Sequence, residues 1–192
     1  MENKNNIIKT LKNELKNGKH NNDVNSIIEK SINSLENNNC NCKCKCNIKR
    51  LNRITDGFTK INGSVPPAEY LPTQNPIILL NTINANGDRV LMVKATRKAG
   101  TRVGIHVHKY GGYTIILSGT MTDFVQGQPN REYGPNTCYY MPPCTPMAAA
   151  NLGDEDVELI DIFIGKPDEP FIQIKEPAWP YKRVGRFDPV PC

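Results

Sequence analysis

Short runs of apolar residues at strand spacing recur along the chain from about residue 75 to residue 165. Turn sequences rich in glycine, asparagine and proline separate them, and no segment of helical periodicity interrupts them. The expected strands are 77–83, 89–96, 102–108, 113–118, 120–125, 138–141, 147–151 and 157–164. Many short strands with turns of this kind predict an all-β domain, either a sandwich or a closed barrel.

The first 50 residues have a different pattern. Fourteen of them are asparagine, a composition that buries too little apolar surface to offset the entropy of ordering. Two stretches nevertheless place apolar residues on one helical face, the first with Ile7, Ile8, Leu11 and Leu15, the second with Val24, Ile27, Ile28, Ile32 and Leu35. Because isolated helices this short are marginal in water, the pattern favours weak helices on a mobile arm. The alternative is a helical hairpin used for oligomerisation or docking.

These changes of pattern divide the chain into four parts. Residues 1–50 form the extension, which is expected to be disordered or weakly helical, and residues 51–74 form a linker and entry segment. The β-domain occupies residues 75–165. Residues 166–192 hold many prolines and are expected to wrap the barrel, with Trp179 as an anchor.

Charge and hydropathy bear on partners and location. The extension carries ten Lys or Arg and five Asp or Glu, so it accounts for the whole net charge of +5. This excess is diluted among asparagines without interleaved aromatic residues, so we do not expect nucleic-acid binding. No apolar run approaches the length that spans a bilayer, and the N-terminus lacks the apolar core of a secretory signal. We therefore expect a protein without membrane spans and with an intracellular, cytoplasmic location.

Four cysteines alternate with other residues at the end of the extension. In an extended chain Cys40, Cys42, Cys44 and Cys46 would line one side, and the lysines between them would favour thiolates. Thiolate clusters suit zinc or Cu(I). Structural zinc sites, however, usually use two ligand pairs separated by a folded spacer, which is absent here. The alternatives are metal or redox chemistry and a reduced linker without a role.

Two histidines stand out in the β-domain. His106 and His108 are two residues apart on an expected strand, so both imidazoles should point to the same face. In a small barrel that face is the interior. Two neutral imidazoles in a barrel make half of a site for a divalent transition metal, with Fe, Mn, Ni, Cu and Zn as the candidates.

The segment around these histidines resembles the cupin family. The run from Gly100 through His106 and His108 to Gly119 is similar to the first cupin motif, and Gly134 through Asn151 to the second. The resemblance implies a cupin-type jelly-roll β-barrel, a bound metal, a small-molecule ligand and a homodimer.

The ligand set that the resemblance implies is incomplete. The glutamate of the first motif falls on Gly112 or Tyr113, and the third histidine falls on Met147. Met147, Tyr113 and Cys138 are therefore possible additional ligands. The alternatives are a tyrosine that closes the barrel and, as the commoner roles, a core methionine and a buried structural cysteine. A candidate pocket is formed by Tyr113, Tyr140, Met147 and Asp161, the last being either buried and paired or exposed at a strand edge.

Three functions remain open after the sequence is considered. The first is a metal-dependent cupin enzyme, oxygenase- or isomerase-like, that acts on a small organic substrate with the metal on His106 and His108. The second is a non-catalytic cupin that binds a small molecule or a metal. The third is a scaffold or interaction module, and the sequence leaves open whether the protein is an enzyme at all.

Overall fold

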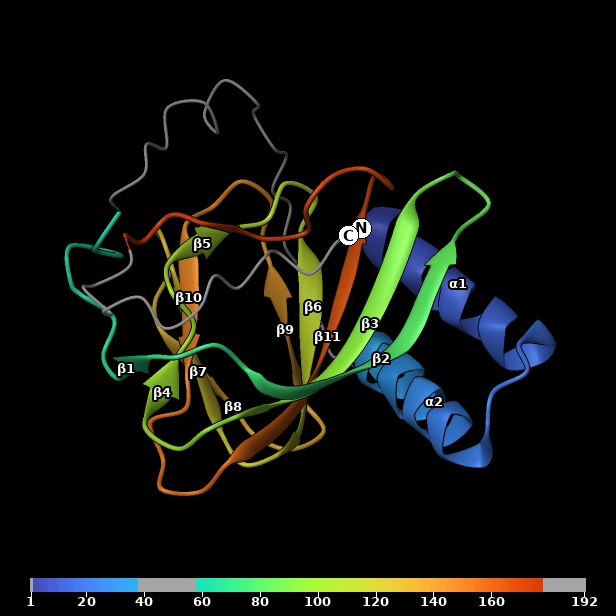
Figure 1. The fold of residues 1–192 in the computed structure, drawn as a ribbon, viewed down its shortest axis with the longest axis horizontal. Helices are drawn as coiled ribbons and strands as arrows, with labels where there is room; N and C mark the ends of the chain where they lie inside the picture. The colour runs from blue at the N-terminus through green and yellow to red at the C-terminus, as the bar shows by residue number, and fades with distance from the viewer. Residues whose placement is uncertain (1, 38–57, 178–192) are drawn as a thin grey trace.

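The protein consists of a helical hairpin followed by a barrel of short strands (Figure 1). The structure is a computed structural model, which describes residues 2–37 and 58–177. The helices are α1 (Glu2–Asn17) and α2 (Asn22–Asn37). The strands are β1 (Glu69–Tyr70), β2 (Gln74–Ile83), β3 (Arg89–Arg97), β4 (Thr101–Arg102), β5 (His106–Val107), β6 (Gly112–Ser118), β7 (Met121–Val125), β8 (Arg131–Tyr133), β9 (Cys138–Met141), β10 (Met147–Ala150), β11 (Val157–Gly165) and β12 (Gln173–Ile174).

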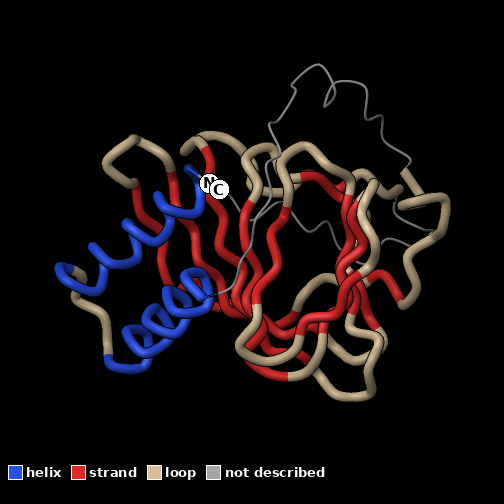
Figure 2. The backbone as a smooth tube through the Cα atoms, turned by 180° about the vertical axis from the view of Figure 1, so that it is seen from behind, coloured by secondary structure: helices blue, strands red, loops and turns tan. Residues whose placement is uncertain are grey.

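The strands form two sheets that share one apolar core. One sheet has the order β2-β3-β11-β6-β9, and the other has the order β1-β4-β10-β5-β12, with β7 paired to β10 and β8 paired to β7. Apolar side chains from both sheets meet between them, among them Ile116 and Leu159 from the first sheet and Met147 and Ala149 from the second. Figure 2 shows the sheets around this core, with the helices to one side. The expected all-β barrel is confirmed, and its interior is the space between the sheets.

Strand β11 shows how the sequence buries both faces of the five-stranded sheet. Leu159 and Phe163 point into the barrel, whereas Ile160 and Ile162 point to the opposite side and pack against the helices. This alternation follows from the two-residue period of a strand. The sheet therefore lies between two apolar layers, the barrel core and the helical hairpin.

The helices of the extension are ordered against this outer face, in contrast to the mobile arm expected from the composition. Ile7, Leu11, Ile28 and Leu35 are fully buried in one cluster with residues of the sheet. The thiol of Cys138, on the sheet, donates to the backbone oxygen of Ser34 at 3.7 Å. The helical periodicity was informative, but stability comes from packing on the sheet, which composition alone does not reveal.

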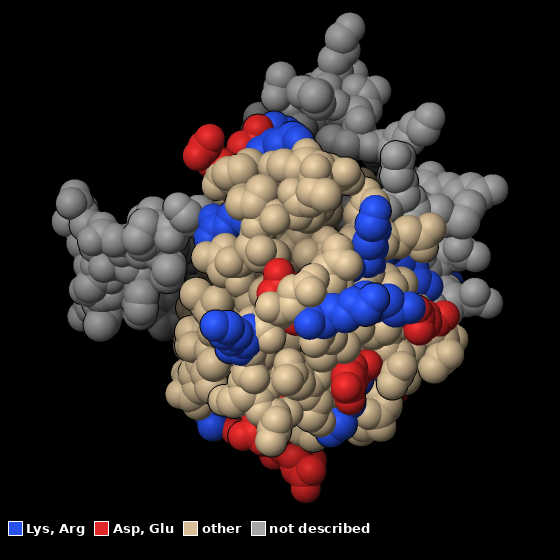
Figure 3. All heavy atoms as spheres, turned by 90° about the vertical axis from the view of Figure 1, so that its right-hand side faces the viewer, with Lys and Arg blue, Asp and Glu red and all other residues tan. Residues whose placement is uncertain are grey.

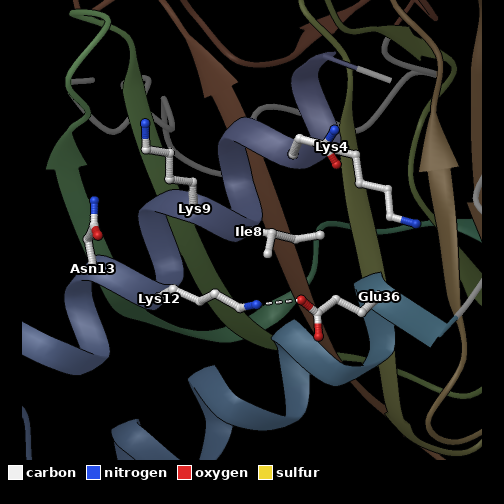
Figure 4. A pocket seen from close by; sticks show the side chains of 7 residues that line it. Lys4, Ile8, Lys9, Lys12, Asn13 and Glu36 are labelled. Carbon is white, nitrogen blue, oxygen red and sulfur yellow. Dashed lines mark hydrogen bonds and ion pairs between the residues drawn. The ribbon is translucent and has the colours of Figure 1, made fainter.

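The outward face of the hairpin is polar. Lys12 of α1 forms an ion pair with Glu36 of α2 at 2.6 Å, and both are well exposed. The pair lies in a shallow hollow lined mainly by α1, which Figure 4 shows on the side of the helix away from the barrel interior. From the side of the molecule shown in Figure 3, basic and acidic side chains are interspersed among neutral ones.

Truncating a buried residue of the hairpin should destabilise the protein. We expect Leu35→Ala to reduce the free energy of unfolding by about 2–5 kcal/mol, because the side chain is fully buried between helix and sheet. Leu15→Ala is the matched control, since Leu15 packs against the same cluster but is only partly buried. Urea unfolding followed by circular dichroism measures both. Equal small losses would mean that the hairpin does not contribute to the folded unit.

The strand predictions hold with four differences. The expected strand 102–108 is divided into β4 and β5, and the short strands β1, β8 and β12 were not predicted. Strand β12 pairs with β5, so the described part of the C-terminal tail does lie against the barrel. The cysteine run and Trp179 lie outside the described residues. Across the ranges 2–37 and 58–177, no helix is long and apolar enough to cross a membrane.

Candidate metal centre

The histidine strand β5 is held between two neighbours. His106 is the register partner of Met147 on β10 and of Ile174 on β12. Glu176, just after β12, accepts a hydrogen bond from the backbone N–H of Ile105 at 2.8 Å. The same carboxylate pairs with the buried Arg102 at 2.6 Å. The C-terminal segment therefore fixes the backbone that positions both histidines.

The structure brings the two imidazoles together, as their spacing predicts. The ring centroids of His106 and His108 are 4.8 Å apart, with the ring planes nearly perpendicular. The side chains are 3% and 1% exposed. The ring of His108 also stacks on Phe163, which in turn stacks on Phe171. The pair therefore lies in an enclosed and largely apolar environment.

Backbone carbonyls determine which nitrogen of each ring carries the proton. The Nδ1 atom of His106 lies 2.7 Å from the carbonyl oxygen of Gly104, and Nδ1 of His108 lies 2.8 Å from that of Phe171. A carbonyl oxygen can only accept, so both Nδ1 atoms carry hydrogen and both Nε2 atoms keep a lone pair. The Nε2 atom of His108 is buried and has no hydrogen-bond partner.

Burial also keeps both rings neutral. Desolvation lowers the pKa of His106 to about 4, against a smaller opposing effect of the bond to Gly104. Desolvation and the neighbouring His106 lower the pKa of His108 to about 3. At neutral pH both imidazoles are therefore uncharged, the form that binds metal ions.

The residues present fit a metal ion as two nitrogen donors, with the sulfur of Met147 as a possible third. The unpartnered Nε2 of His108 and the bonds from Nδ1 to carbonyls are the arrangement found in metal-bound histidines. Met147 is buried in the barrel core beside His106. In the described part of the chain, no group of three His, Cys, Asp or Glu residues could hold a metal.

The position of the missing glutamate is occupied by other atoms. A Cβ atom added at Gly112 would meet the backbone oxygen of Ile162 and Cε of Met141, each at 2.7 Å. An acidic side chain at this position would therefore require the sheet or its core neighbours to move. The packing around Gly112 therefore leaves no room for a glutamate ligand.

The remaining predicted ligands and pocket residues are divided between the two faces of the sheet. Tyr113, Tyr140 and Cys138 belong to the cluster beneath the helices. Strand alternation directs these side chains away from the interior. This placement disagrees with the predicted ligand role of Tyr113 and Cys138 and with the predicted pocket role of the two tyrosines. Cys144 is disulfide-bonded, which removes its thiolate as a metal donor.

Asp161 lies on the interior face of β11, as a pocket residue should. Its Oδ1 atom accepts a hydrogen bond of 2.6 Å from the hydroxyl of Thr114 on β6. Burial raises the pKa of Asp161 to about 6, although Thr114 and Arg97 act in the opposite direction. A carboxyl group that changes protonation near neutral pH can accept or return a proton within the barrel.

Two interior features were missed by sequence analysis. Arg97, the last residue of β3, is buried in the barrel. It lies two residues after Ala95 of the barrel core, and this strand spacing is the signal that could have predicted its inward position. Glu176 supports the histidine strand from outside the expected domain. No local pattern marks Glu176, because its partners lie about seventy residues earlier in the chain.

Comparisons with known proteins agree with this architecture. A family profile described as the cupin domain matches residues 94–163, which span most of the strands around the histidines. No curated protein matches the chain.

Solved structures are similar at low identity. An uncharacterized conserved protein with a double-stranded β-helix domain from Klebsiella pneumoniae is 19% identical over 56% of this chain and 91% of its own, with a TM-score of 0.43. An RmlC-like cupin family protein from Methanocaldococcus jannaschii is 19% identical over 52% and 90%, with a TM-score of 0.41. The DMSP lyase DddQ from Ruegeria pomeroyi is 18% identical over 55% of this chain and 53% of its own, with a TM-score of 0.44. The profile match covers the strands around His106 and His108, and residues 94–163 are therefore similar to the cupin domain.

Proposed function

We propose that this cupin domain binds a transition metal through the Nε2 atoms of His106 and His108 and acts on a small organic molecule inside the barrel. The buried, unpartnered Nε2 of His108 is the observation that carries the proposal. Leaving such an acceptor unsatisfied costs about 1–3 kcal/mol, and a metal ion would remove that penalty. When bound, the metal would polarise a substrate oxygen or activate a water molecule.

Asp161 supports proton transfer as the reaction type. Its carboxyl group faces the interior and has a pKa of about 6, so it can take a proton from a bound molecule and return it. Of the two chemistries expected from the sequence, this favours the isomerase-like one over the oxygenase-like one. Phe163 and Phe171 would exclude water from the side of His108.

Met147 favours copper among the candidate metals. A thioether is a soft ligand that suits Cu(I) and binds Fe(II), Mn(II) and Zn(II) poorly. Met147 is the register partner of His106, so both side chains emerge on the same face of neighbouring strands. Met147→Leu should therefore weaken Cu(I) binding while leaving Zn(II) binding unchanged.

Metal analysis after reconstitution tests the proposal. The purified full chain is loaded without oxygen with Cu(I), Zn(II), Fe(II), Mn(II) or Ni(II), desalted, and measured by plasma mass spectrometry. We expect near-stoichiometric metal in the wild type and its loss in the His106→Ala/His108→Ala variant. His20→Ala is the matched control, because His20 lies between the helices and contacts Glu14.

A further variant separates the barrel from the cysteine run. Replacing Cys40, Cys42, Cys44 and Cys46 by serine should leave the barrel metal in place. Loss of metal in that variant, with retention in the double histidine variant, would assign binding to the cysteines. Absence of metal from every variant would contradict the proposal and favour a scaffold role.

A non-catalytic metal-binding cupin is the second candidate. The near-complete burial of both histidines supports it, because a substrate must reach a metal to be transformed. Stoichiometric metal without turnover on a broad panel of small organic substrates would favour this alternative.

A further inference from the structure

Arg97 carries a positive charge into the interior of the barrel. Arg97 is the last residue of β3, and its side chain points inward like that of Ala95 two residues earlier. Its register partner on β11 is Val157 of the barrel core. The side chain is 3% exposed. Asp161 and Tyr139 are close enough to affect its protonation, so the three groups are neighbours in the barrel.

No carboxylate of the described residues lies within ion-pair distance of this charge. Within the described residues Arg97 forms no ion pair, and the only hydrogen bond of its side chain is from Nη1 to the backbone oxygen of Leu71. The Nε atom is buried without a partner. Arg102 shows the usual solution, since its guanidinium bonds both carboxylate oxygens of Glu176 at 2.6 and 2.7 Å. A buried guanidinium without such a partner is costly, and arginine is the side chain best suited to binding a carboxylate.

We propose that Arg97 binds the carboxylate of a small organic acid that enters the barrel. The inference deepens the proposed function by naming the substrate class of the same interior. An incoming carboxylate would satisfy the Nε–H and neutralise the charge, forming the charge-assisted hydrogen bonds that Arg97 otherwise lacks.

The neighbouring groups restrict the acid further. Apolar residues such as Ala95, Ile116 and Leu159 surround the interior and suit a short aliphatic chain. The carboxyl group of Asp161 faces the same space and would repel a second negative charge. These features favour a monocarboxylate over a dicarboxylate, with Asp161 placed to exchange a proton with the rest of the molecule.

Nuclear magnetic resonance of the metal-free, full-length protein tests the inference directly. The Arg97 Nε–H signal is assigned by its absence from Arg97→Lys, and the protein is titrated with propionate or with propionamide, its neutral counterpart. We expect this signal to shift with propionate but not with propionamide. Succinate should bind more weakly than propionate.

Variants give the second measurement. By calorimetry, Arg97→Met should weaken propionate binding by about ten- to a hundredfold, the range for hydrogen bonds to a charged group. Arg89→Met is the matched control, because Arg89 lies on the same strand but bonds Asn81 at the surface. If Arg97→Met does not fold, the titration of the wild type still decides.

The outcomes distinguish this inference from the metal proposal. Equal responses to propionate and propionamide, or a propionate response that survives in Arg97→Met, would overturn the carboxylate site. Because the titrations use metal-free protein, they do not depend on whether His106 and His108 bind a metal. Metal binding without carboxylate binding would leave the metal proposal intact and refute this one.

Discussion

Replacing Glu176 by alanine is expected to lower the free energy of unfolding by about 3–5 kcal/mol, the usual cost of removing one partner of a buried ion pair. Glu176 accepts two hydrogen bonds from Arg102 and one from the backbone N–H of Ile105. Its removal leaves the guanidinium of Arg102, whose Nε already lacks a partner, buried without a counter-charge. Thermal or urea unfolding measures the loss.

The same substitution should also affect the histidine site. Ile105 immediately precedes His106, and its carbonyl accepts hydrogen bonds from the backbone of Lys175 and Glu176. Loosening this segment would disturb the strand that orients both imidazoles. Losses of supporting contacts around metal sites typically weaken affinity by about ten- to a hundredfold, and we expect an effect in this range.

Glu169→Ala is the control for both measurements. Glu169 is also in the C-terminal segment and pairs with Lys109, but both side chains are partly exposed. Water and salt screen exposed pairs of this kind, so little change is expected. Equal effects of the two substitutions would contradict a specific role for Glu176.

Asp161→Asn is expected to stabilise the metal-free protein above pH 7 by up to about 3 kcal/mol. This amount corresponds to the change in the pKa of Asp161 from 3.8 to about 6, which burial causes. At high pH the wild type must bury a charged carboxylate, whereas asparagine is neutral and its oxygen can still accept the bond from Thr114.

The advantage of the variant should disappear in acid. Between about pH 6 and pH 4 the folded wild type has taken up a proton on Asp161 that the unfolded chain has not, so acidification stabilises the wild type relative to the variant. Unfolding curves of both proteins from pH 4 to pH 8 measure the difference. The exposed substitution Asp154→Asn is the control, and a difference independent of pH would show that the carboxyl group is not desolvated.

The sequence by itself determined the features that depend on local period and spacing. Apolar runs predicted most of the strands, because alternation along a strand is visible within a few residues. The two-residue separation of His106 and His108 predicted a shared face, and the structure brings their rings within 4.8 Å. The helical faces of residues 2–37 were visible for the same reason.

The tertiary structure decided which face of each strand is the interior and what surrounds it. Tyr113 and Asp161 both lie on strands of one sheet, yet one points to the helices and the other into the barrel. Their assignment depends on which layer covers each face, information that no single strand contains. The sequence could not show that the hairpin is that layer, because its stability derives from contacts with the sheet.

The site itself depends on groups that are distant in sequence. The carbonyl of Phe171 orients His108, and Glu176 supports the backbone before His106. The isolation of Arg97 is also a tertiary property, because only the fold shows that no carboxylate of the described chain pairs with it. Spacing along the chain predicts which side chains share a strand face, whereas hydrogen bonding and desolvation by remote segments determine what those side chains can do.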